Sequence, residues 1–168
     1  MARSVIWTVA FVLVAATLQS TLLSRVAVRG AVPDLALGIA VYAAYVNGLM
    51  AGQVSGFFGG VALDLVSAAP LGLNALVRTV VGAAAGLARG KVILDFFLVP
   101  VALCAAATLL KAGLLFPLSL VFQGVPSYPI AGPTLWAELA LNALSAPALF
   151  AFLRRFDGLL AVKGVRDA

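Results

Sequence analysis

The stretch GLMAGQVSGFFGGVALD, residues 48–64, has a small or polar residue at every fourth position, namely Gly48, Gly52, Gly56, Gly60 and Asp64. The following stretch NALVRTVVGAAAGLARG, residues 74–90, repeats this spacing with Asn74, Arg78, Gly82, Gly86 and Gly90. Helices associate in lipid through close backbone approach, which glycines spaced by four permit. The two series therefore predict two neighbouring helices in tight contact. Packing within the subunit and docking of another protein both stay open as uses of these glycines.

The composition of the whole chain places this helix pair in a membrane. Of the 168 residues, 64% are hydrophobic and 10% are charged, whereas soluble domains have about 45–50% and about 25%. One crossing uses about 20 residues, so the length allows about six or seven crossings and no separate soluble domain. We predict an all-α polytopic membrane protein that forms a single transmembrane domain over residues 1–168.

Turn signals divide the apolar sequence into six predicted crossings. The 29 uncharged residues between Asp34 and Asp64 would form a helix of about 44 Å, too long for one crossing, so we expect a turn at Asn47 and Gly48. Pro70 and Gly72 mark the next turn. The predicted crossings are 5–23, 35–47, 48–66, 71–89, 96–122 and 135–153. For the long segment 96–122, a tilt, a proline kink and a re-entrant end all stay open.

The basic residues predict the orientation. Six crossings put both termini on one side, which collects seven of the eleven basic residues: Arg3, Arg89, Lys91, Arg154, Arg155, Lys163 and Arg166. The opposite side holds Arg25 and Arg29. By the positive-inside rule, both termini are cytoplasmic. The formal charge of +5 thus reflects topology, and the sequence contains no basic run of the kind that binds nucleic acid.

Charged residues inside the predicted crossings need a counterion or a polar environment. Asp64 and Arg78 meet if the two glycine-containing helices form an antiparallel hairpin, so we predict an intramembrane ion pair with Asn74 nearby, because an unpaired charge in lipid is costly. A cavity or a partner's helix is the alternative environment for these groups. Glu138 is interpreted as an anion at the start of the last helix, where the helix dipole favours it. The role of Lys111 stays open.

Catalytic signatures are absent from the sequence. The chain has no histidine and one cysteine, Cys104, so Ser-His and Cys-His catalysis and histidine-based metal sites are excluded. An aspartyl mechanism needs two carboxylates in one site, and Asp64 has no evident second carboxylate. We predict a protein that is not an enzyme and that uses neither a metal nor a cofactor.

The block from Pro33 to Gly90 resembles the rod shape-determining protein MreD family. The resemblance lies in PDL at the start of the second helix, LDLVSAAPLG after the glycine series and LNAL at the start of the fourth helix. The residues that match the family pattern are Pro33, Asp34, Gly56, Gly60, Asp64, Pro70, Gly72, Asn74 and Gly82.

This resemblance implies a non-catalytic scaffold in the bacterial inner membrane that supports peptidoglycan synthesis and cell shape within the elongation complex. It implies MreC as the direct partner, and MreB, RodA and the RodA transpeptidase as indirect ones, in a membrane-lipid environment and without nucleic acid. A homo-oligomer stays open. The implied fold is similar to that of the S component of energy-coupling-factor transporters.

Such a vitamin-binding S subunit is the alternative function. These subunits use alanines spaced by four in the first helix for docking, and the alanines at positions 10, 15 and 16 lack that spacing. The scaffold is therefore the preferred interpretation.

Overall fold

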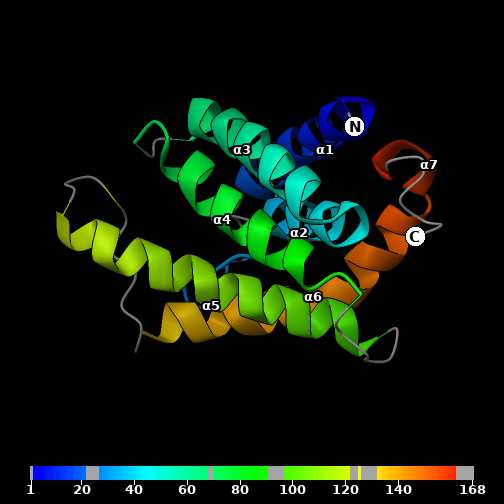
Figure 1. The fold of residues 1–168 in the computed structure, drawn as a ribbon. Coiled ribbons are helices and arrows are strands. Elements are labelled where there is room, and N and C mark those ends of the chain that lie inside the picture. The colour runs from blue at the N-terminus through cyan, green and yellow to red at the C-terminus, as the bar shows by residue number, and fades with distance from the viewer. Residues whose placement is uncertain are drawn as a thin grey trace.

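The computed structural model describes residues 2–21, 27–67, 70–90, 97–121, 125 and 132–161, and the regular elements in these ranges are all helices (Figure 1). In chain order they are α1 (Ala2–Thr21), α2 (Leu35–Asn47), α3 (Leu49–Val66), α4 (Leu73–Leu87), α5 (Leu98–Val121), α6 (Pro133–Arg154) and α7 (Asp157–Leu160). The all-helical prediction is confirmed for these residues. The single turn α7 was not predicted. Several residues used above lie outside the described ranges: Arg25, Lys91, Lys163, Arg166 and the predicted span ends at 22, 23, 96 and 122.

Within the described residues, four helices are long and apolar enough to cross a membrane: α1, α3, α5 and α6. Helix α2 has 13 residues and α4 has 15, which correspond to about 20 and 22 Å at 1.5 Å per residue. Both fall short of a hydrocarbon core of about 30 Å. The long helices make the chain a multi-pass membrane protein, whereas the count of six crossings stays a prediction.

Successive helices run in alternating directions. Helix α2 returns to the start of α1, where Nδ2 of Asn47 lies 3.3 Å from Oγ of Ser4 and 2.9 Å from the carbonyl oxygen of Leu160. Helix α4 returns to the start of α3, as the position of Gly86 near its end shows: a Cβ built on Gly86 would lie 2.6 Å from Cα of Leu49. We call the end where Ser4, Asn47 and Leu160 meet the N-terminal end of the bundle, and the opposite one the far end.

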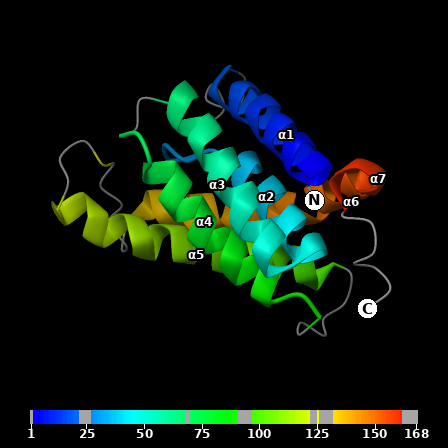
Figure 2. The ribbon, with the colours of Figure 1, turned by 45° about the horizontal axis from the view of Figure 1, so that its top comes forward.

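Helix α2 forms the centre of the bundle and packs against α1, α3, α4, α5 and α6 (Figure 2). Residues 36–44 of this helix are all buried. A helix that is apolar on every side is stable only when other helices surround it. Close approach is required as well, since a Cβ built on Gly38 would lie 2.5 Å from the side chain of Leu149.

The most extensive helix contact joins α3 and α4. A Cβ on Gly56 would lie 2.8 Å from the carbonyl carbon of Arg78, and one on Gly60 would lie 2.6 Å from the backbone nitrogen of Ala75. Five glycines face the opposite backbone in this way, and we call this contact the glycine seam: Gly52, Gly56, Gly60, Gly82 and Gly86. The two helices therefore touch along their backbones, as lipid-embedded helices with small residues do.

The glycines at the two ends of the series lie in turns. Gly90 has a φ of +70°, and a Cβ built on it would meet no other group within 4 Å, so it does not face the backbone of α3 as the seam glycines face the opposite helix. Its use in partner binding stays a prediction. Gly48 joins α2 to α3 with a φ of +87°, a conformation that favours glycine. Both glycines lie outside the helices, because α3 begins at Leu49 and α4 ends at Leu87. The carbonyl carbon of Gly48 still lies at the α3–α4 contact, 2.7 Å from a Cβ built on Gly86.

Two adjacent glycines provide a matched test of the seam. Gly60→Ala should destabilise the protein by about 1–3 kcal/mol, because the new Cβ overlaps the backbone of α4 and forces the helices apart. Gly59→Ala should cost little, since a Cβ there lies 3.6 Å from Val12, an ordinary contact. Thermal unfolding of both variants in detergent measures the difference. Equal unfolding midpoints would contradict the seam.

Candidate functional site

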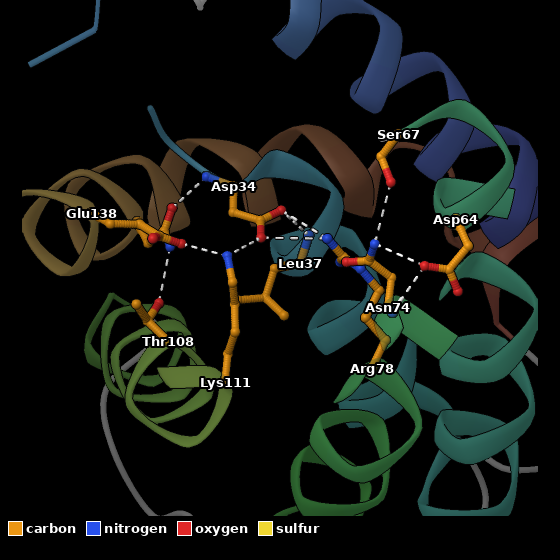
Figure 3. A network of polar contacts seen from close by, with 10 residues as sticks. Asp34, Leu37, Asp64, Ser67, Asn74, Arg78, Thr108, Lys111 and Glu138 are labelled. Atoms are coloured by element: carbon orange, nitrogen blue, oxygen red, sulfur yellow. Dashed lines mark hydrogen bonds and ion pairs between the residues drawn. The ribbon is translucent and has the colours of Figure 1, made fainter. Parts of the chain in front are cut away.

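The candidate site is a buried cluster of charges centred on Asp34, at the start of α2 (Figure 3). Oδ1 of Asp34 accepts a hydrogen bond from the backbone nitrogen of Leu37 at 2.9 Å and so caps α2. The residue is only 7% exposed. A buried carboxylate needs partners that compensate for its lost hydration. Two cations from other helices provide them.

Arg78 of α4 is the first of these cations. Its Nη2 lies 3.0 Å from Oδ1 and 3.3 Å from Oδ2 of Asp34, and both side chains are buried. The prediction that Arg78 pairs with Asp64 is therefore wrong. Nε and Nη1 of Arg78 have no hydrogen-bond partner among the described residues, so Nη2 makes the side-chain hydrogen bonds that Arg78 has there.

Lys111 of α5 is the second cation, and it joins two carboxylates. Its Nζ lies 2.8 Å from Oδ2 of Asp34 and 2.7 Å from Oε1 of Glu138 of α6. The role left open for Lys111 is thus an interhelical bridge. Glu138, interpreted from the sequence as a helix-capping anion, is instead buried in the second turn of α6 and engaged in this ion pair.

Neutral side chains extend the cluster along α5 and α6. Oδ1 of Asn142 accepts from the backbone nitrogen of Asp34 at 2.6 Å, and its Nδ2 donates to Oγ1 of Thr108 at 2.9 Å. Thr108 in turn donates to the carbonyl oxygen of Cys104 at 2.8 Å. We call the set Asp34, Arg78, Thr108, Lys111, Glu138 and Asn142 the charge network. It connects α2, α4, α5 and α6.

The charge network contains two cations and two carboxylates, so its formal charge is zero. Neutrality matters because a lone ion in a low-dielectric interior costs several kcal/mol. A cavity of about 10 Å³ lies beside Asp34, Asn142 and Ser145, which is near the lower limit for one water molecule. The hydrogen bonds and ion pairs of the charge network hold four helices in one relative arrangement.

Asp64 forms a second polar centre, at the turn between α3 and α4. Its Oδ2 accepts from the backbone nitrogens of Gly72 at 3.0 Å and Ala75 at 3.1 Å. Its Oδ1 accepts from the backbone nitrogen of Asn74 at 3.0 Å and from the Asn74 side chain at 2.9 Å. The prediction that Asn74 lies near Asp64 is therefore confirmed. The carboxylate of Asp64 accepts hydrogen bonds from backbone N–H groups at the start of α4 that have no partner within the helix.

The two turn residues predicted from the sequence shape this second centre. Gly72 precedes α4 with a φ of +91°, which favours glycine. The carbonyl oxygen of Pro70 accepts from the backbone nitrogen of Leu73 at 3.1 Å. The turn thus directs its amide groups toward Asp64.

Sequence reasoning missed Asp34 as the centre of the network, together with Thr108 and Asn142. A signal was available in the charges: Arg78 and Lys111 both fall inside predicted crossings, and each needs a carboxylate. With Asp64 as the only counterion, these two cations would leave one positive charge uncompensated. In the described ranges, no group of three or more histidine, cysteine, aspartate or glutamate side chains lies close enough to hold a metal ion.

A double-mutant cycle tests the network and our correction together. Asp34→Asn leaves an excess positive charge in the interior and should cost about 3–5 kcal/mol. Adding Arg78→Met restores neutrality, so the double variant should regain part of this loss in thermal unfolding. The control cycle combines Asp64→Asn with Arg78→Met, and its two effects should add because no hydrogen bond or ion pair joins these two side chains. Strong coupling in the control cycle, or none between Asp34 and Arg78, would contradict the network.

The sequence matches the family described as rod shape-determining protein MreD over residues 1–156, which include α1 to α6 with the glycine seam and the charge network. No curated protein and no solved structure matches it, so the expected likeness to the S-component fold stays a prediction. Because the family match covers nearly the whole sequence, this chain belongs to the rod shape-determining protein MreD family.

Proposed function

We propose that the chain is a non-catalytic scaffold of the bacterial cell-elongation complex and supports peptidoglycan synthesis from within the inner membrane. The observation that carries this proposal is the family match over residues 1–156, which supports a role in rod-shape determination. The geometry is in keeping with a scaffold. The charged groups of the network are engaged with one another, and the seam holds two helices in backbone contact.

The proposed direct partner is MreC, and through it the complex would reach MreB filaments, RodA and its transpeptidase. The seam glycines are covered by the facing helix of the same subunit, so a partner reaches them only if α3 and α4 separate. We therefore assign the seam to internal packing and expect MreC to bind another surface. Neither the comparisons nor the described structure favours the alternative of a vitamin-transporter subunit.

Six crossings with cytoplasmic termini are part of the proposal. The alternating directions of α1 to α6 support six crossings, with α2 as a short central helix and α4 as a short helix packed on α3. Arg3 at the start of α1 donates to the carbonyl oxygen of Gly158 at 2.5 Å, which supports placing the start of α1 and the turn α7 on the same side. The described residues Arg89, Arg154 and Arg155 add positive charge at that end, as expected of a cytoplasmic face.

Complementation in a rod-shaped bacterium depleted of its own MreD tests this function. The full chain should restore rod shape and retain MreC on co-purification. Gly60→Leu should abolish both, because the side chain drives α4 from α3. Gly113→Leu should retain both, since nothing lies within 4 Å of a Cβ built on Gly113. If the inserted full chain restored neither shape nor MreC retention, the scaffold assignment would be wrong.

A further inference from the structure

A partly open cavity of about 280 Å³ lies at the N-terminal end of the bundle, between the end of α2, the first turn of α5 and the junction of α6 with α7. Tyr42, Tyr45 and Phe150 form its aromatic walls, and Arg154 and Asp157 supply its charged groups. None of these residues belongs to the glycine seam or to the charge network. The cavity is therefore a separate feature of the molecule.

The wall that carries Asp157 is held in place by buried contacts. Tyr42 is 2% exposed, packs edge-on against Phe150 with ring centroids 5.0 Å apart, and donates its hydroxyl hydrogen to Oδ1 of Asp157. The turn α7 continues to Leu160, which is fully buried and whose carbonyl oxygen accepts from Asn47 at 2.9 Å and from the hydroxyl of Ser4. Contacts within the subunit thus fix this wall of the cavity.

Positive charge dominates this end of the bundle. Among the described residues at this end there is one acid, Asp157. The arginines there are Arg3, Arg89, Arg154 and Arg155. Of the four, Arg154 lines the cavity and is exposed. Basic pockets between transmembrane helices at the cytoplasmic side bind lipid headgroups, and tyrosines are enriched at that depth. The cavity has two tyrosines and one arginine in its lining, together with Asp157, and it lies at the arginine-rich end that the proposed function assigns to the cytoplasmic side.

We propose that this cavity binds the headgroup of an anionic phospholipid whose headgroup carries hydroxyl groups, such as phosphatidylglycerol. Arg154 would pair with the phosphodiester of the headgroup. Tyr45, which also lines the cavity, would donate its hydroxyl hydrogen to the headgroup. Asp157 accepts a hydrogen bond from Tyr42, and an ionised carboxylate has further acceptor sites. It therefore favours a headgroup whose hydroxyl groups can donate hydrogen bonds to it. The apolar lining, which includes Val46 and Val99, suits the glycerol backbone and the first carbons of the acyl chains.

Native mass spectrometry of the purified full chain with added phosphatidylglycerol or phosphatidylcholine tests this site. The wild type should retain phosphatidylglycerol preferentially, and Arg154→Gln should lower that retention about fivefold, as expected for one arginine near an anionic lipid. Arg155→Gln is the matched control, because Arg155 is exposed and lies outside the cavity lining. It should retain the lipid like the wild type.

Tyr45→Phe keeps the ring and removes only the hydroxyl, so it should lower retention without affecting the fold. Equal losses in the Arg154 and Arg155 variants would overturn the proposal, and so would equal retention of the two lipids by the wild type. Competition by soluble glycerol phosphate alone, at the same concentration as the lipid, would assign the cavity to a soluble phosphate compound and overturn the lipid assignment.

Discussion

Neutrality of the buried charges is the constraint on which the rest of the structure depends. Asp34 is both the cap of the central helix α2 and the counterion of Arg78 and Lys111, so one carboxylate ties the start of α2 to α4 and α5. Lys111 also forms an ion pair with Glu138, which adds α6 to the connected helices. Because lipid cannot solvate a lone ion, these four side chains have to meet, and their meeting point determines how α2, α4, α5 and α6 are arranged.

The glycine seam and the charge network hold different helices of the bundle together. The seam makes α3 and α4 a closely packed pair through backbone contacts that any larger side chain would prevent. The network connects this pair, through Arg78, to the central helix and to α5 and α6. Together they favour a bundle with one relative placement of its helices. A multi-pass protein of the rod shape-determining MreD family needs such a fixed surface if it is to hold other membrane proteins in place.

The two ends of the bundle differ in how they handle charge. At the far end, carboxylates accept hydrogen bonds from helix starts and from cations, as Asp34 does for α2 and Asp64 for α4. At the N-terminal end, arginines such as Arg154 lie at the surface beside a cavity with aromatic walls. The carboxylates Asp34 and Asp64 at the far end are thus buried and hydrogen-bonded, whereas Arg154 and Arg155 at the N-terminal end are exposed. This asymmetry follows from where the helices begin and end.

The sequence by itself determined the membrane class, the all-helical fold and the close contact of α3 with α4, because these depend on composition and on spacing along one helix. It also placed Asn74 beside Asp64, since the turn between them is short. Only the tertiary structure decided that Arg78 pairs with Asp34 and that Glu138 meets Lys111, 44 and 27 residues apart in the chain. Such pairs depend on how whole helices are arranged around α2, and the spacing of residues within one helix does not tell which other helix supplies the counterion.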